Sequence, residues 1–255
     1  MADPIVHMFP CLKDNYGFLL HDPESGETAC IDTPEADRIL AEADGKGWKI
    51  TQIWNTHWHP DHAGGNSAIK AATGCRIVGP KGEAAKIPTL ERQLVEGDTV
   101  KLGALKANVL ETPGHTAGHI VYHLPEHRIA FVGDTLFALG CGRLFEGTAQ
   151  QMWTSLGKLR AMPDDTTIYC AHEYTQANAA FALSVDPENR DLQLYADEVA
   201  TRRSAGRPTV PTSIGKEKRA NPFLRADDPR LQAFVGHAGD AVATFAEVRE
   251  RKNRF

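Results

Sequence analysis

Several features that mark other classes of protein are missing from this chain. No apolar run approaches the ~20 residues that a helix needs to cross a bilayer, which argues against a membrane protein. Residues 1–4 lack the basic segment and apolar stretch of a secretory signal. The five cysteines are odd in number and form no C-x-x-C pair, which favours free thiols in a reducing compartment. We therefore expect a cytoplasmic protein with no membrane partner.

No internal repeat or low-complexity segment is visible either, but charge is unevenly distributed. Residues 201–255 carry 12 Lys and Arg against 6 Asp and Glu, whereas residues 1–200 carry 16 against 27. A basic tail can bind an anionic ligand or nucleic acid, or it can be a solvated helical surface. We expect no nucleic-acid binding, because the basic residues near 202–203 and 216–219 lack interleaved aromatic side chains for base stacking.

The hydrophobic pattern divides the chain near residue 173. Before it, short alternating runs predict strands at 5–9, 16–21, 28–32, 50–55, 75–78, 100–102, 105–110, 120–124, 129–132 and 167–170. Helices are predicted at 36–43 and 68–73 and from Thr148, where Gln151 completes a capping box; residues 80–98 support no strong prediction. After it, helical runs follow at 174–183, 192–203, 231–234 and 241–251. We predict a mixed α/β domain over 1–172 and an all-helical domain over 173–255.

A dense group of metal-ligand side chains follows the strand predicted at 50–55. Residues 56–62 read T-H-W-H-P-D-H, which places three imidazoles and one carboxylate within six positions. In an extended segment His57 and His59 point to the same side, so this pair can chelate one ion. Asp61 and His62 follow a proline, where the chain can turn into a helix, and they are free to hold a second ion. Such density favours a metal site over ordinary loop histidines.

Three further residues of the same kind come just after other predicted strands, and they are His115, Asp134 and His172. Ligands collected from several strand ends can converge on one edge of a sheet. Seven candidate ligands exceed the four of a single closed site, so the sequence predicts two ions that share one carboxylate. The other histidines, His7, His21, His123, His127 and His237, are expected to be ordinary, with His119 a possible supporting residue behind His115.

The motif at 56–62, together with G-H-T at 114–116, G-D at 133–134 and the later His172, closely resembles the metallo-β-lactamase superfamily. That resemblance implies an αββα sandwich that carries a dinuclear site. By the pattern of the superfamily, one ion would be bound by His57, His59 and His115, and the other by Asp61, His62 and His172. Asp134 would bridge the two ions.

Other segments resemble glyoxalase II, the hydroxyacylglutathione hydrolases: 140–148, 171–175, Asn178, 210–213, 221–225 and 249–252. The match extends over essentially the whole chain, including the helical tail. It implies hydrolysis of S-D-lactoylglutathione to D-lactate and glutathione, the second step of methylglyoxal detoxification. It also implies that the glutathione moiety is bound by Arg143, Tyr174, Arg249 and Lys252. Arg143 stands where some members have lysine, and Phe145 where some have tyrosine, which removes a hydroxyl donor.

The expected reaction is attack on the thioester carbonyl by a hydroxide that bridges the two ions, with Asp61 and Asp134 as catalytic ligands. Zinc suits this ligand set best, although iron and manganese suit it too. Two other reactions stay open: a lactonase or β-lactamase, and a glutathione persulfide dioxygenase with one iron. The expected partner is a small-molecule glutathione thioester, and a monomer is the default.

Overall fold

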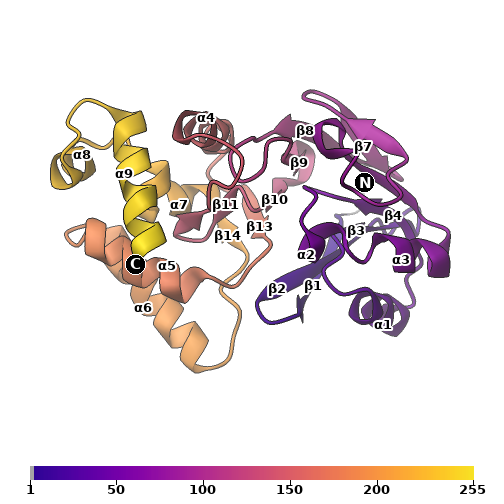
Figure 1. The fold of residues 1–255 in the computed structure, drawn as a ribbon. Coiled ribbons are helices and arrows are strands. Elements are labelled where there is room, and N and C mark those ends of the chain that lie inside the picture. The colour runs from indigo at the N-terminus through magenta and orange to yellow at the C-terminus, as the bar shows by residue number, and fades with distance from the viewer. Residues whose placement is uncertain (1–2) are drawn as a thin grey trace. The chain divides into compact units, whose positions relative to one another are not determined.

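The computed structural model describes residues 3–255, and the chain divides into two compact units (Figure 1). The first unit comprises the described residues up to Glu111 together with Ala117–Gly133. The second unit comprises Thr112–Thr116 and Asp134–Phe255. This division follows the density of contacts and not the change of hydrophobic pattern, so the domain boundary at residue 173 stays a prediction.

The first unit contains a six-stranded sheet with the order β1-β2-β3-β4-β5-β6. Its strands are β1 (Ile5–Cys11), β2 (Asn15–His21), β3 (Thr28–Ile31), β4 (Ile50–Trp54), β5 (Arg76–Pro80) and β6 (Arg92–Leu94). The first three are antiparallel, and β3, β4, β5 and β6 run parallel. Parallel strands end at the same edge of a sheet, so the residues that follow β3 and β4 come together there.

Helices cover this sheet and supply its connections. They are α1 (Ala36–Lys46), α2 (Pro60–Ala63), α3 (Asn66–Thr73) and the 3-10 turn η1 (Lys81–Glu83). Ile39 of α1 and Ile69 of α3 pack against Ile53 and Ile77 of the sheet, and all four are buried. This apolar layer fixes the height of α1 and α3 above the strands.

The first unit also contains four antiparallel strands, β7 (Thr99–Leu102), β8 (Leu105–Glu111), β9 (Ile120–Leu124) and β10 (Ile129–Gly133), with the 3-10 turn η2 (Pro125–His127) between the last two. Burial alternates along β8, where Leu105, Ala107 and Val109 are buried and the residues between them are not. The strand predictions from sequence therefore agree with the structure here, because alternation reports a half-buried strand directly.

The second unit combines short strands with helices. Its elements are β11 (Leu136–Phe137), β12 (Gly140–Cys141), α4 (Ala149–Arg160), β13 (Thr167–Cys170), α5 (Thr175–Val185), α6 (Arg190–Ser204), β14 (Thr212–Ser213), α7 (Ile214–Ala220), η3 (Pro222–Leu224), α8 (Pro229–Val235) and α9 (Ala241–Arg254). The capping box predicted for α4 is present, with Thr148 and Gln151 bonded reciprocally.

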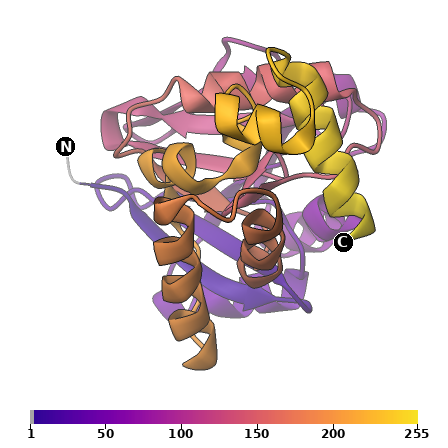
Figure 2. The same ribbon diagram turned by 90° about the vertical axis from the view of Figure 1, so that its left-hand side faces the viewer.

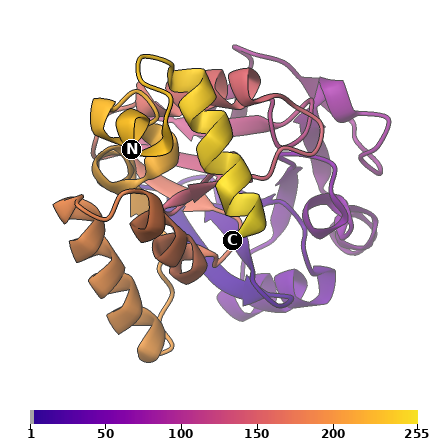
Figure 3. The same cartoon turned by 60° about the vertical axis from the view of Figure 1, so that its left-hand side comes forward.

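The helices of the second unit pack in pairs. Helix α5 packs against α6, and α9 packs against α4 and α8 (Figures 2 and 3). The sequence pattern did not predict β11, β12, β14 or α7. The three strands have two residues each, too few to show a period. Among the described residues, no helix is long and apolar enough to cross a membrane.

Candidate metal centre

The first unit positions four of the predicted ligands in one loop. Strand β4 ends at Trp54, His57 is fully buried, and Pro60 starts α2. Nε2 of His57 lies 3.1 Å from Nδ1 of His59, and Nε2 of His62 lies 3.5 Å from Oδ2 of Asp61. Two atoms bound tetrahedrally to one zinc ion at ~2.0–2.1 Å lie about 3.3 Å apart. Both pairs therefore have the spacing of two ligands on one ion.

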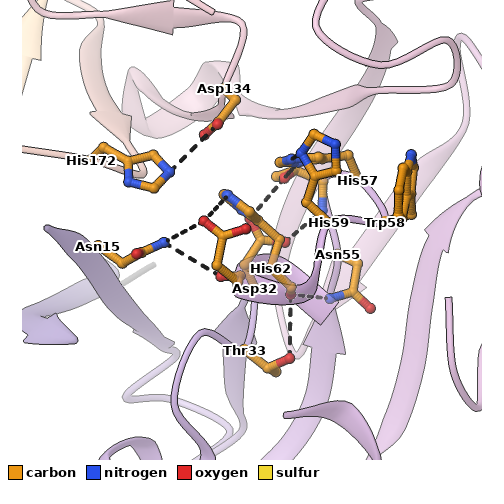
Figure 4. Close-up of polar contacts among 12 residues, drawn as sticks. Asn15, Asp32, Thr33, Asn55, His57, Trp58, His59, His62, Asp134 and His172 are labelled. Carbon is orange, nitrogen blue, oxygen red and sulfur yellow. Dashed lines mark hydrogen bonds and ion pairs between the residues drawn. The ribbon is translucent and has the colours of Figure 1, made fainter. Parts of the chain in front are cut away.

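A buried aspartate that sequence analysis did not single out orients two of these histidines. Oδ2 of Asp32 lies 2.8 Å from Nδ1 of His62 and accepts a hydrogen bond of 2.7 Å from Thr56 Oγ1 (Figure 4). That hydroxyl lies 3.0 Å from Nδ1 of His57, and Oδ1 of Asp32 accepts from the Thr56 backbone N–H at 2.7 Å. With Nδ1–H donating in each ring, Nε2 of His57 and of His62 is left as the metal-binding atom.

The loop itself is held by side chains from elsewhere in the first unit. Glu83 accepts from the backbone N–H of Trp58 at 2.7 Å and of Gly118 at 2.9 Å. Nδ2 of Asn15 donates to Oδ2 of Asp61 at 3.0 Å. Sequence analysis made no strong prediction for 80–98, so Glu83 was missed. Asp32 carried one usable signal, because it is an acidic residue directly after a strand, as Asp134 is.

The second unit brings the other three predicted ligands together. Oδ2 of Asp134 lies 3.3 Å from Nε2 of His115. It also lies 3.5 Å from Nε2 of His172 (Figure 4). All three side chains are buried. One carboxylate oxygen thus lies at ligand spacing from two imidazoles, which fits both a shared carboxylate and three ligands of one ion.

Both of these histidines have fixed ring orientations. Nδ1 of His115 donates to the backbone carbonyl of Arg143 at 2.8 Å, which leaves Nε2 as its ligand atom. The ring of His172 stacks on Tyr174, with 4.7 Å between centroids and 2° between planes. Tyr174 is 38% exposed and packs against His172.

Three of the remaining histidines have other neighbours. His7 bonds Glu42, and His21 stacks on Trp48. His119 is fully buried, and its ring lies 4.8 Å from that of His57 at 28°. This contact supports His119 as a packing neighbour of a ligand.

The donor chemistry fits a hard or borderline divalent cation. The candidate ligands are imidazoles and carboxylates, which suit zinc, iron and manganese. Thiolates play no part: all five cysteines are buried, and burial raises the pKa of Cys11 and Cys170 to about 12 and that of Cys141 to about 11. A thiol must lose its proton to bind a metal, so these cysteines stay neutral and apolar.

The four residues predicted to bind glutathione lie in the second unit in different environments. Arg143 is exposed, with its guanidinium 6.0 Å from the centroid of the Phe145 ring. Arg249 is only 6% exposed, and its Nη1 donates to the carbonyl of Cys141 at 3.0 Å. Lys252 donates to the carbonyl of Ala177 at 3.0 Å. Arg249 therefore already has a backbone partner, which the helical spacing of residues 249 and 252 did not reveal.

Lys252 has a lowered pKa. Partial burial, followed by the nearby charge of Arg249, lowers the pKa of its ammonium group to about 8. The side chain runs between two aromatic rings, with Nζ 5.2 Å from the Phe181 centroid and 5.4 Å from that of Phe255. Cation–π contacts offset part of the loss of hydration.

Known proteins share both the fold and the family patterns. The family model for the metallo-beta-lactamase superfamily matches residues 31–172, and that for the hydroxyacylglutathione hydrolase C-terminus matches 173–255. Among solved structures, ETHE1 from Myxococcus xanthus is similar over 98% of this chain and 91% of its own, with a TM-score of 0.72 and 28% identity. TTHA1623 in a di-iron-bound form is similar over 86% of this chain and over the whole length of TTHA1623, with a TM-score of 0.62 and 23% identity. The match of the family model over more than half of the chain shows that it is a member of the metallo-β-lactamase superfamily, as predicted.

Curated relatives narrow the class. The hydroxyacylglutathione hydrolase of Maricaulis maris (strain MCS10) is 60% identical over the full length of both chains, and that of Hyphomonas neptunium (strain ATCC 15444) is 56% identical over 98% of each. That of Rhizobium meliloti (strain 1021) is 53% identical over the full length of both chains. The chain belongs to the hydroxyacylglutathione hydrolase family, which confirms the family inferred from its motifs.

Proposed function

We propose that this protein is a thioester hydrolase that converts S-(2-hydroxyacyl)glutathione, typically S-D-lactoylglutathione, to D-lactate and glutathione. The observation that carries the proposal is full-length identity of up to 60% with hydroxyacylglutathione hydrolases, the helical residues 173–255 included. A similarity of fold alone would not identify the thiol part of the substrate. The match of residues 173–255 to the hydroxyacylglutathione hydrolase C-terminus points to glutathione.

The proposed metal ligands are the seven predicted from sequence. His57, His59 and His115 would hold one ion, Asp61, His62 and His172 would hold the other, and Asp134 would be shared between them. Spacings of 3.1–3.5 Å between ligand atoms within each unit support these assignments. When bound, two divalent ions supply a nucleophilic hydroxide at neutral pH and an electrophile for the thioester carbonyl. Zinc is the proposed metal, with iron or manganese as substitutes.

The side chains of this protein orient the attack. The amide of Asn15 holds one carboxylate oxygen of Asp61 at 3.0 Å, so that Asp61 can receive the proton of the attacking water in a fixed geometry. The leaving group is the thiolate of glutathione, whose conjugate acid has a pKa near ~8.5 in the cysteine reference. It departs at neutral pH without a dedicated acid.

Four side chains are proposed to bind the glutathione moiety. Arg143, Arg249 and Lys252 provide positive charge for its two carboxylates, and Tyr174 provides a half-exposed ring and hydroxyl beside His172. Phe145, which is 60% exposed, offers an apolar surface and no hydrogen bond. We further propose a cytoplasmic monomer, in keeping with five buried free cysteines.

The test is the loss of thioester absorbance with S-D-lactoylglutathione, run beside the same acyl group on a truncated thiol that lacks the glutathione carboxylates. We expect kcat/KM to favour the full substrate by a large factor. Equal rates would mean that the helical residues do not recognise glutathione. No hydrolysis of either by metal-loaded protein would overturn the proposal and direct the search to lactones, β-lactams and, if one iron is bound per chain, persulfides.

A further inference from the structure

The hairpin formed by β11 and β12 is held almost entirely by side chains of helices. Its strands have two residues each, too few to be stable alone. Nδ2 of Asn221 donates to the carbonyls of Phe137 at 3.2 Å and Gly140 at 3.0 Å. Nδ2 of Asn178 donates to the carbonyl of Ala138 at 3.1 Å, and Glu217 accepts from the backbone N–H of Leu139 at 2.8 Å. Arg249 binds the carbonyl of Cys141, so every residue from 137 to 141 has a backbone group bound by a side chain of α5, α7 or α9 or by Asn221, which directly follows α7.

Glu217 is the centre of this arrangement. Its carboxylate is fully buried and accepts four hydrogen bonds: one oxygen from Leu139 N–H and Asn221 Nδ2, the other from Thr212 Oγ1 at 2.7 Å and Tyr195 OH at 3.1 Å. Burial raises the pKa of this carboxyl above its usual value. Any other position of this carboxylate would leave buried donors without partners, which is unfavourable in free energy. The four hydrogen bonds therefore hold the carboxylate and its donors in one arrangement.

The two ends of the hairpin carry parts of the candidate metal centre. Asp134 comes two residues before β11, and Gly142 follows β12 directly. The backbone N–H of Gly142 donates to the carbonyl of Thr135 at 3.3 Å. The next carbonyl, that of Arg143, accepts from Nδ1 of His115 at 2.8 Å. A Cβ on Gly142 would lie 2.0 Å from the carbonyl oxygen of Asp134. The two ends of the hairpin are therefore in close contact, with no space for a side chain at residue 142.

We propose that Asn221 and Glu217 are positioning residues for the metal centre. They fix the hairpin, and the hairpin fixes both Asp134 and the Arg143 carbonyl that sets the ring of His115. This inference rests on the proposed function, since that proposal makes His115 and Asp134 metal ligands. The chain of contacts runs entirely through groups of the second unit.

The test compares two asparagines that occupy the same kind of position. Asn221 caps η3 through its side-chain oxygen, which accepts from Phe223 N–H, while its amide binds the hairpin. Asn189 caps α6 in the same way, and its amide donates to the carbonyl of Arg219 at 3.0 Å and not to the hairpin. Serine at either site keeps the capping oxygen and removes the amide donors. Asn189→Ser is therefore a matched control for Asn221→Ser.

Metal affinity, measured by competition with a chromophoric zinc chelator, is the main measurement, with the free energy of unfolding of the metal-free protein beside it. We expect Asn221→Ser to lower zinc affinity by about 10- to 100-fold, as loss of a supporting contact to a metal ligand does. Asn189→Ser should lower stability by a comparable amount and leave zinc affinity unchanged. Equal zinc affinities for the two variants would overturn the proposal.

Three further variants cover a failure of Asn221→Ser to fold. Asn178→Ser removes only the bond to Ala138, and we expect a smaller but measurable fall in zinc affinity. Glu217→Gln keeps one acceptor for Leu139 and can donate to the hydroxyls of Thr212 and Tyr195, so its zinc affinity should stay near that of the parent. Glu217→Ala removes all of these hydrogen bonds, and its zinc affinity should fall. Asn178→Ser at parental affinity, or Glu217→Ala equal to Glu217→Gln, would contradict the proposal. Since zinc binding is measured apart from turnover, a parent protein that binds zinc but hydrolyses no thioester would refute the proposed function alone.

Discussion

At the scale of single residues, the histidines of the candidate centre depend on groups that are not ligands. Nδ1 of His62 faces Asp32, that of His57 faces the hydroxyl of Thr56, and that of His115 faces the carbonyl of Arg143. Such contacts select the tautomer and hold the ring plane before a metal arrives.

Replacing Asp32 with asparagine tests this dependence. The amide has one acceptor oxygen, whereas the carboxylate accepts from the N–H and hydroxyl of Thr56 and from His62, so at least one donor loses its partner. We expect metal affinity, measured by chelator competition, to fall by about 10- to 100-fold. Asp22→Asn is the matched control, because Asp22 is also a buried aspartate just after a strand, bonded to Ser25 and Ala104. If both variants bind zinc equally well, Asp32 does not orient the ligands.

The lowered pKa of Lys252 predicts a pH dependence of substrate binding. Near pH 7 its ammonium group is charged, and above a pKa of about 8 the charge is lost, whereas an ordinary lysine keeps it beyond pH 10. We expect KM for S-D-lactoylglutathione to rise between pH 7 and 9 while kcat changes little. The same shift affects stability. Because the unfolded chain binds this proton more tightly than the folded chain does, the contribution of Lys252 to the free energy of unfolding increases as pH rises past 8.

Lys252→Arg is the control for that effect, because guanidinium keeps its charge throughout this range. Its KM should be flat from pH 7 to 9. A parent KM that is equally flat would show that Lys252 does not bind a glutathione carboxylate.

At the scale of elements, ends of strands supply the chemistry. Asp32 follows β3 and Thr56 follows β4, and these strands are parallel neighbours, so both residues lie at one edge of the sheet. Strand β10 ends in Gly133, whose φ is +48°. A Cβ there would lie 2.6 Å from Thr56 Oγ1 and 2.7 Å from Nε2 of His119, so only glycine leaves space for the groups behind His57.

Gly133→Ala therefore combines backbone strain with a steric collision. Gly74→Ala has the backbone strain without the collision, so a comparison of the two variants separates these effects. Gly74 ends α3 with a φ of +71°, and a Cβ there would meet nothing within 4 Å. We expect Gly74→Ala to lower the free energy of unfolding by about 1–2 kcal/mol. Gly133→Ala should lose about 1–3 kcal/mol more from overpacking and should also bind metal more weakly. Urea denaturation of metal-free protein measures the first effect, and equal losses for both variants would rule out the collision.

At the scale of the whole molecule, the proposed ligands come from residues 57 to 172, so metal binding should stabilise the folded chain. A ligand at 100 times its Kd adds about 2.7 kcal/mol to the free energy of unfolding. For a chain of this size we expect chelation to lower Tm by roughly 5–10 °C, and added zinc to restore it. His57→Asn, which loses one ligand, should show a smaller shift. An unchanged Tm after metal removal would contradict a resident metal.

The sequence by itself determined the family and most of the regular elements, and it supplied the candidate metal ligands, which stay a prediction. A count of ligand side chains in residues 56–62 needs no coordinates, and alternation in β8 or a capping box at Thr148 reports local structure directly. The two-residue strands β11, β12 and β14 carry no period, so their pairing was not predictable. Whether residues 1–172 and 173–255 are separate domains stays a prediction.

Only the tertiary structure decided which side chains support the ligands. Asp32, Glu83 and Glu217 are ordinary acidic residues in the sequence, and their roles come from donors that lie 24 to 78 positions away along the chain. Arg249 shows the same limit, because helical spacing placed it beside Lys252, while its carbonyl partner at residue 141 is set by packing. The local sequence pattern indicates which residues are buried and which side chains are of a metal-ligand type. Hydrogen-bond partners between distant segments depend on how the chain folds.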